Sequence, residues 1–324
     1  MTKMNMIDAI KSALDSEMKK DKSVIVIGED VGINGGVFRA TDGLFKKYGP
    51  DRVIDTPLTE EGIMGNAVGL ALNGLKPVVE IQFSAFMAPA FDQIFTHASK
   101  MRTRSRGRFT CPLVVRGPSG GGIRALELHC ENPEAYYAHI PGVKVVYPST
   151  PYDAKGLLIS AIRDPDPVIF LEPMRIYRAI KEEVPDKAYT IPLGKAKVVR
   201  EGTDLTVVSW GAMVKYAGDA IEKIADKIDV ELIDLRTIYP FDINAILKSL
   251  EKTGKLVIIH EAPKTSGFGA EIAASVAEKG LDYLEAPIKR ITGYDTALPF
   301  AKMELDWIPS EERIIKGIKE VMDY

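Results

Sequence analysis

Short, fully apolar segments alternate with helix-like segments along the whole chain, and this alternation constrains the fold more than any other feature. Strands that are apolar on both faces are typical of parallel sheets covered by helices on both sides. The apolar segments are 23–30, 77–83, 112–116, 143–148 and 167–173 in the first half, and 204–211, 229–235, 255–261 and 288–292 in the second half. The alternation predicts an α/β architecture with mainly parallel sheets.

A charged segment that contains three prolines, residues 172–194, separates the two halves. This composition is typical of a connection that runs over the surface of a protein. A chain of 324 residues also exceeds the usual size of a single hydrophobic core. We therefore expect two doubly wound α/β domains, residues 1–185 and residues 186–324.

Composition excludes several classes of protein. The formal net charge of −3 argues against a nucleic-acid binder, which normally carries a strong basic excess. Two cysteines are too few for a disulfide scaffold and suit a reducing compartment. The N-terminal segment places its apolar residues on one helical face, unlike a leader peptide, and no apolar run reaches the roughly 18 residues that span a membrane. These features predict a cytoplasmic protein with no membrane segment.

The segment “DTPLTEEGIMG”, residues 55–65, places Glu60 and Glu61 side by side in the first turn of a predicted helix. One interpretation is structural, because Thr59 is a suitable N-cap and first-turn carboxylates interact favourably with the helix dipole. Three glycines follow on the same helix, namely Gly62, Gly65 and Gly69. Each costs about 1 kcal/mol of helix propensity, which favours a face that another backbone approaches closely, as in a contact between subunits.

Three further segments carry candidate chemistry. “GPSGGG”, residues 117–122, follows a predicted strand but lacks the Lys-Ser/Thr ending of a nucleotide-binding loop, so a phosphate loop and a flexible loop beside a substrate are equal alternatives. His129 is a candidate general acid–base, with a solvated loop histidine as the equal alternative. The basic segment 100–108 fits an anion-binding patch less well than a helix C-terminus with stabilising cations. No histidine has the spacing to a cysteine that a zinc site requires.

Several motifs taken together resemble one family. They are “GEDVG”, “GGVFRAT”, “DTPLTEEGI”, “EIQFSAF”, “NPEAYYAHIPGVKVVYPSTPYDAKGLL”, “PVIFLEP”, “VVSWG”, “YPFD” and “HEAPKTSGFGAEI”. This set closely resembles the beta subunit of the decarboxylating first component of 2-oxo acid dehydrogenase complexes, over nearly the whole chain. The resemblance implies a thiamine diphosphate pyrimidine-binding domain of transketolase type in residues 1–185, followed by a domain of transketolase C-terminal type in residues 186–324.

The resemblance also implies roles for single residues. Glu60 matches the glutamate that contacts a ring nitrogen of the cofactor's aminopyrimidine and favours the tautomer that deprotonates the thiazolium carbon. Phe86 matches the aromatic residue that packs against the pyrimidine ring, and Gln82 matches a residue that lines the site. His129 matches the histidine near the substrate and the incoming lipoyl group. After His129 this chain has Cys130, where relatives commonly have serine.

One missing motif implies that the site is divided between two chains. The sequence contains no Gly-Asp-Gly, the motif with which thiamine diphosphate enzymes hold the diphosphate and magnesium. The family places that half of the site on an alpha subunit, in a heterotetramer of two alpha and two beta chains. Asp164 and Asp166 fall where some relatives hold a structural potassium ion.

The resemblance therefore implies an enzyme that is active only together with an alpha subunit. It would oxidatively decarboxylate a 2-oxo acid, either pyruvate or, slightly favoured, a branched-chain acid, and pass the acyl group to lipoyl groups of a transacylase core. One alternative is a split transketolase C-terminal half, against which the segments 133–142 and 148–158 argue. The other is a non-catalytic scaffold subunit, against which the presence of Glu60, Phe86 and His129 argues.

Overall fold

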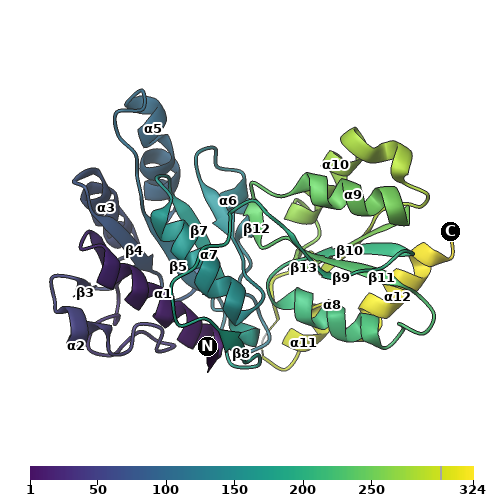
Figure 1. The fold of residues 1–324 in the computed structure, drawn as a ribbon, viewed down its shortest axis with the longest axis horizontal. Helices are drawn as coiled ribbons and strands as arrows, with labels where there is room; N and C mark the ends of the chain where they lie inside the picture. The colour runs from purple at the N-terminus through teal and green to yellow at the C-terminus, as the bar shows by residue number, and fades with distance from the viewer. Residues whose placement is uncertain (300) are drawn as a thin grey trace.

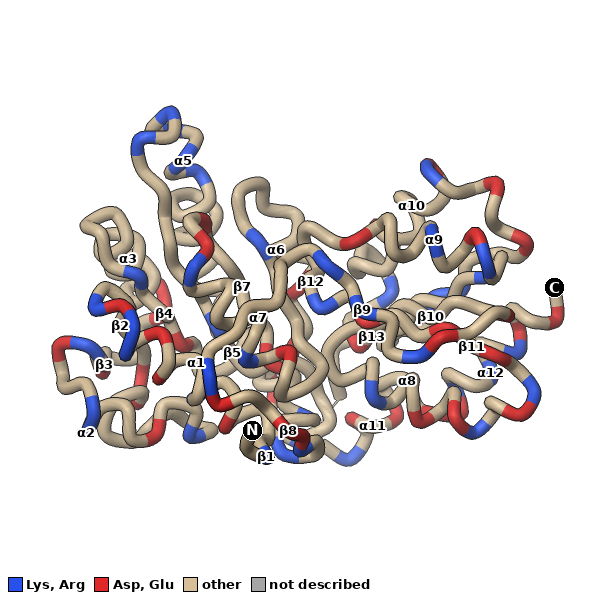
Figure 2. Tube along the Cα trace, viewed as in Figure 1, with Lys and Arg blue, Asp and Glu red and all other residues tan. Residues whose placement is uncertain are grey.

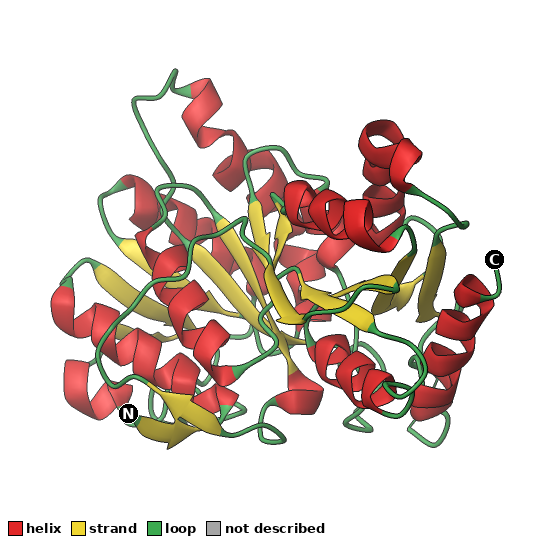
Figure 3. Cartoon of the chain, turned by 45° about the vertical axis from the view of Figure 1, so that its right-hand side comes forward, coloured by secondary structure: helices red, strands yellow, loops and turns green. Residues whose placement is uncertain are grey.

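The computed structural model describes residues 1–299 and 301–324. It contains a seven-stranded sheet and a five-stranded sheet, which lie in successive halves of the chain (Figure 1). Helices cover the faces of the sheets, as Figure 3 shows from a second direction. The α/β class predicted from the alternation of apolar segments is confirmed. Among the described residues, no helix is long and apolar enough to cross a membrane.

The larger sheet belongs mainly to the first half of the chain. Its strands, in sheet order, are β12 (Thr237–Tyr239), β6 (Lys144–Val146), β7 (Val168–Pro173), β5 (Val114–Ser119), β4 (Lys76–Glu80), β2 (Val24–Gly28) and β3 (Val53–Asp55). All neighbours run parallel except β12, which is antiparallel to β6. Because β3 and β4 pair with opposite sides of β2, the sheet reverses its direction of growth there. Open α/β sheets bind their ligands at such a switch point.

Seven α-helices surround this sheet in the described part of the chain, and two of them have side-chain N-caps. The seven are α1 (Met6–Lys20), α2 (Leu44–Tyr48), α3 (Glu60–Leu72), α4 (Met87–Asp92), α5 (Met101–Arg104), α6 (Glu134–Ala138) and α7 (Pro151–Arg163). Asn5 and Asp8 form a capping box at the start of α1, and Thr150 caps α7. The predicted cationic helix end is found at α5, whose tip projects from the first domain with its basic residues exposed (Figure 2).

The smaller sheet is formed by the second half of the chain. Its strands, in order, are β14 (Lys289–Gly293), β13 (Leu256–Pro263), β10 (Leu205–Ser209), β11 (Val230–Asp234) and β9 (Lys197–Arg200), with β9 antiparallel. The helices are α8 (Ala212–Glu222), α9 (Ile243–Thr253), α10 (Phe268–Gly280), α11 (Glu304–Trp307) and α12 (Glu311–Met322). This half has the doubly wound pattern expected for a second domain.

The two halves are interlocked. The connecting segment runs along the first domain, where β8 (Glu182–Val184) pairs with β1 (Thr2–Met4). Strand β12 comes from the second half of the sequence but completes the first sheet, and one cluster of buried apolar side chains extends from α3 to α10. The division at residues 185 and 186 stays a prediction.

A buried guanidinium joins three strands in the middle of the larger sheet. Arg116 on β5 donates two hydrogen bonds to the Glu172 carboxylate on β7, at 2.5 and 2.8 Å, and pairs with Glu80 on β4. Tyr177 donates to the same Glu172 carboxylate at 2.6 Å. Burial raises the pKa of Glu80, and the charge of Arg116 opposes that rise. Within this group of four residues, Arg116 carries the positive charge, and it lies against two buried carboxylates.

Replacing Arg116 with methionine should lower the free energy of unfolding by about 3–5 kcal/mol, because Glu80 and Glu172 are left buried without a cation. Urea unfolding of the purified chain measures this. The control is Lys289→Met, which breaks a solvent-exposed pair with Glu320 and should leave the unfolding midpoint nearly unchanged. Equal losses in the two variants would contradict the central role of Arg116.

Candidate active site

Four of the residues that sequence reasoning selected lie at one edge of the larger sheet, where its parallel strands end. Glu60 opens α3 after β3, Gln82 and Phe86 follow β4, and His129 lies in the loop after β5. Glu29 follows β2 directly at the switch point, although sequence reasoning did not select it. The rule that ligands bind at the carboxyl ends of the strands next to a switch point would have found it.

The two adjacent glutamates have different surroundings. Glu60 is half-buried and lies near Glu29, so that its negative charge affects the pKa of the Glu29 carboxyl. Burial raises the pKa of the Glu29 carboxyl, and the neighbouring charges of Asp30 and Glu60 raise it further. Glu61, the next residue, is exposed. This edge of the sheet therefore concentrates negative charge around Glu60.

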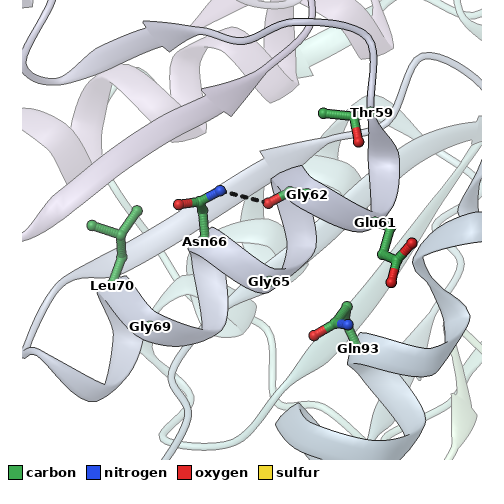
Figure 4. A pocket seen from close by; sticks show the side chains of 8 residues that line it. All are labelled: Thr59, Glu61, Gly62, Gly65, Asn66, Gly69, Leu70 and Gln93. Carbon is green, nitrogen blue, oxygen red and sulfur yellow. Dashed lines mark hydrogen bonds between the residues drawn. The ribbon is translucent and has the colours of Figure 1, made fainter.

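The glycine face of α3 is open in this chain. A hollow of about 640 Å³ lies beside the helix. Figure 4 shows Glu61 on the first turn and Gln93 on a neighbouring helical segment, across from Gly65. The residues that line the hollow are Thr59, Glu61, Gly62, Gly65, Asn66, Gly69, Leu70 and Gln93. A Cβ added at Gly65 would meet only the Gln93 side chain, at 3.5 Å, and one at Gly69 would meet no described atom within 4 Å. No described backbone of this chain packs against these glycines.

His129 packs against two phenylalanine rings. Its ring centroid lies 4.4 Å from that of Phe83 and 5.1 Å from that of Phe86, with edge-to-face geometry in both pairs. Its Nδ1 lies 2.8 Å from the carbonyl oxygen of Glu127. Because a carbonyl oxygen only accepts hydrogen bonds, Nδ1 carries a proton, and Nε2 is the nitrogen that gains or loses one. The loop thus presents a histidine in a fixed tautomer beside an aromatic wall.

Local geometry after β4 differs from the prediction. The segment 77–83 was expected to be one strand with Gln82 on it, but the strand ends at Glu80 and residues 84–86 form a 3-10 helix. Gln82 is half-buried in the bend between them. Phe83, which sequence reasoning passed over, lies closer to His129 than Phe86 does. The early end of the strand is what turns both aromatic side chains toward the His129 loop.

The glycine-rich segment 117–122 uses its backbone amides within the protein. The amide of Gly121 donates to the Glu261 carboxylate at 3.0 Å, and the amide of Arg124 donates to the Glu304 carboxylate at 2.7 Å. Both acids belong to the second domain. Because carboxylates of the chain itself occupy these two donors, the structure disfavours the phosphate-loop alternative.

Asp164 and Asp166 lie at the opposite edge of the sheet, just before β7. Lys144 pairs with Asp164 at 2.7 Å, and Arg102 pairs with Asp166 at 2.8 Å. Within the described part of the chain, no cluster of three or more histidine, cysteine or acidic side chains has metal-binding geometry. The predicted potassium site stays a prediction, with both carboxylates already paired to cations.

Comparison with known proteins decides the family. Residues 2–179 match the transketolase pyrimidine-binding domain, and residues 194–314 match the transketolase C-terminal domain. The chain is 54% identical to the pyruvate dehydrogenase E1 component subunit beta of Acholeplasma laidlawii, over 99% of this chain and 98% of that protein. It is 50% identical to the corresponding subunit of Bacillus subtilis (strain 168) over the full length of both. The chain belongs to this family of E1 beta subunits.

A solved structure described as a split gene transketolase, an inactive beta4 tetramer, has a TM-score of 0.81 and covers 99% of each chain at 19% identity. This likeness shows a shared fold. The family predicted from the motifs is confirmed, as are the types of its two successive domains. The family is one of thiamine diphosphate enzymes related to transketolase.

Glu134, at the start of α6, makes stability depend on pH. Burial raises the pKa of this carboxyl to about 8, although Trp210 donates to it at 3.3 Å. Between pH 4.5 and 8 the folded chain therefore keeps a proton that the unfolded chain releases, so stability falls as pH rises through this window. The slope reaches about 1.4 kcal/mol per pH unit.

Glu134→Gln should remove this contribution and make the curve of unfolding free energy against pH less steep between 5 and 8. Asp234 and Glu261, whose pKa values burial raises to about 7, keep the remaining slope. Urea titrations at several pH values measure the change. The exposed carboxyl Glu278 provides the control, because Glu278→Gln should leave the curve unchanged. A Glu134→Gln curve as steep as that of the unmodified chain would contradict the raised pKa.

Proposed function

We propose that this chain is the beta subunit of a pyruvate dehydrogenase E1 component and supplies the aminopyrimidine half of a thiamine diphosphate site. The observation that carries the proposal is the grouping of Glu60, Phe86 and His129 at the switch-point edge of the sheet. Pyruvate is favoured over branched-chain acids because the similar relatives reported above are named for pyruvate. The sequence motifs slightly favoured branched-chain acids, but no relative reported above is named for them.

The residues present fit the pyrimidine part of the cofactor. Phe86 offers a half-buried aromatic ring to a flat heterocycle, and Glu60 offers a carboxylate at a half-buried position where charge is already concentrated. When bound, thiamine diphosphate supplies the carbon nucleophile and the electron sink for decarboxylation. Glu60 would share a proton with the pyrimidine ring, and His129 would give or take a proton at Nε2 near the substrate.

The same edge does not fit a diphosphate. Glu29, Asp30 and Glu60 make it acidic, and the amides of Gly121 and Arg124 are already bonded to carboxylates. An acidic edge repels phosphate groups. This supports the proposal that an alpha subunit holds the diphosphate and magnesium, in a heterotetramer of two alpha and two beta chains.

Exposed apolar side chains near the site support a partner there. They are Ile33, Leu58, Leu126 and Leu128, with exposed fractions of 80%, 71%, 73% and 53%. Leu58 immediately precedes α3, and Leu126 and Leu128 lie in the His129 loop. Large exposed apolar residues beside a site usually mark an interaction surface. We place the alpha subunit on this surface and the lipoyl groups of a transacylase at the same opening.

Two alternatives remain from the sequence. The split transketolase resembles this chain in fold, but at 19% identity, whereas the E1 beta subunits reach 54% over nearly full length. A non-catalytic scaffold would need no fixed tautomer at His129. Both cysteines are free and buried, which fits the reducing cytoplasm in which we place the enzyme.

Reconstitution tests the proposed function. Pyruvate-dependent reduction of an artificial electron acceptor, with thiamine diphosphate and magnesium, should appear only when this chain is mixed with its alpha subunit. Branched-chain 2-oxo acids in parallel assays establish the substrate. Activity of this chain alone would overturn the half-site argument, and silence of an assembled mixture would favour the scaffold.

In the active mixture, Glu60→Gln should lower the rate by about 10²-fold or more, because glutamine cannot share its proton with the cofactor. Glu61→Gln is the matched control on the neighbouring residue and should keep nearly full activity. Size-exclusion chromatography must show the same assembly for both variants. Similar losses in the two variants would contradict the assignment of Glu60.

We also propose that the open glycine face of α3 packs against another subunit. Gly69→Ala should stabilise the isolated chain by about 0.5–1 kcal/mol, because alanine favours a helix, yet weaken assembly. Gly218→Ala on α8, where a Cβ has ordinary van der Waals space, should stabilise the chain without affecting assembly. Analytical ultracentrifugation with the alpha subunit compares them, and unchanged assembly in Gly69→Ala would exclude a tight contact at this face.

A further inference from the structure

Two acids of the second domain hold the loop that carries His129. Glu261 on β13 and Glu304 at the start of α11 are 5% and 1% exposed. As described above, they accept the amides of Gly121 and Arg124. These contacts span 140 and 180 residues of sequence. The loop is therefore anchored to the second domain, while His129 is packed against the first.

The glycines of “GPSGGG” let the loop backbone approach these acids. A Cβ at Gly120 would lie 2.6 Å from the Glu261 carboxylate, and Gly120 has a φ of +84°. A Cβ at Gly121 would lie 2.9 Å from the Ile308 side chain and 3.2 Å from the Glu304 carboxylate. Side chains at these positions would push the loop away from the second domain. The motif is thus explained as a docking segment.

The other end of the loop is anchored to the first domain. The carbonyl oxygen of Glu131 accepts three hydrogen bonds at 3.0 Å, from the hydroxyls of Ser84 and Ser119 and from the amide of Gly120. Between the two anchors, Cys130 is buried beside Glu304, and burial together with that carboxylate raises the pKa of its thiol to about 12. His129 therefore lies within a segment that is fixed on both sides.

We propose that Glu261 and Glu304 are positioning residues, through which the second domain sets the place of the His129 ring in the active site. Burying two carboxylates is costly unless donors satisfy them. Each acid nevertheless has one buried oxygen without a hydrogen-bond partner in the described part of the structure. Burying these carboxylates lowers the stability of the fold. In return it fixes a loop in which Arg124 and Leu128 have a positive φ. Only the role of His129 in this inference rests on the proposed function.

Proteolysis of the full-length chain tests the anchor without any activity. The Arg124 side chain is exposed, but its backbone is held by Glu304. Trypsin needs that backbone released to cut efficiently, so Glu304→Ala should raise the rate of the cut about tenfold or more, a factor equivalent to 1.4 kcal/mol. Glu304→Gln keeps an acceptor oxygen and should stay close to the unmodified chain. Glu278→Ala is the control for an exposed acid of the same domain, and cutting at Arg106 on the α5 tip is an internal reference.

A second variant guards against misfolding of Glu304→Ala. Gly121→Ala keeps both acids but adds a methyl group against Ile308, so it should also accelerate the cut after Arg124. Melting temperatures confirm that each variant is folded. An unchanged cutting rate at Arg124 in folded Glu304→Ala or Gly121→Ala would overturn the anchor, whatever the activity of the enzyme.

Kinetics of the reconstituted enzyme test the positioning role. Glu304→Ala should lower kcat about tenfold, with little change in KM for thiamine diphosphate, because Glu60 and Phe86 lie outside the loop. In a His129→Ala background the same substitution should add almost nothing, since residues that act as a unit are not additive. Glu304→Gln should restore most of kcat. If the losses in kcat from the two substitutions were additive, the effect of Glu304→Ala would be merely structural and the positioning role would be overturned. A reconstituted enzyme without any activity would instead count against the proposed function.

Discussion

The ion network around Arg116 is the constraint on which the site edge depends. One guanidinium joins β4, β5 and β7, and it neutralises carboxylates that the sheet buries on either side of it. Glu80, the last residue of β4, is thereby fixed. The chain turns at once into the segment with Phe83 and Phe86, while β5 continues into the His129 loop. A shift between these two strands would separate the histidine from its aromatic wall.

The second domain completes this edge from the other side. Strand β12 extends the first sheet, and the buried core is continuous between the halves. The loop after β5 is bonded to Ser84 and Ser119 at one end and to Glu261 and Glu304 at the other. A change in how the domains pack would therefore be transmitted to the His129 ring through two hydrogen bonds, without involving the Glu60 helix.

The sequence predicted the parts of this structure that depend on local patterns. Apolar runs located the buried strands, but not the short strands β1, β3, β8, β9 and β12. Helix α3 begins where it was predicted, but Thr59, its predicted N-cap, makes no side-chain capping hydrogen bond. The sequence prediction was wrong about the end of β4, because Ile81 and Phe83 continue the apolar pattern of the strand while the backbone there bends away from the sheet. The Glu261 and Glu304 contacts carry no local signal, since each joins segments more than a hundred residues apart. Glu60 and His129 were candidates from the sequence alone, but only the family resemblance assigned their roles, because first-turn glutamates and loop histidines are ordinary in any protein.

Electrostatics gives the strongest physical reason to expect an obligatory partner. A diphosphate needs cations, a metal ion or free backbone amides. At this edge the acids Glu29, Asp30 and Glu60 gather, and the amides of Gly121 and Arg124 are bonded to Glu261 and Glu304. The hydrogen bonds that hold the His129 loop therefore occupy backbone donors that a phosphate could otherwise use. A chain built in this way can present a carboxylate and an aromatic ring to a neutral heterocycle, and it leaves the charged end of the same ligand to another subunit.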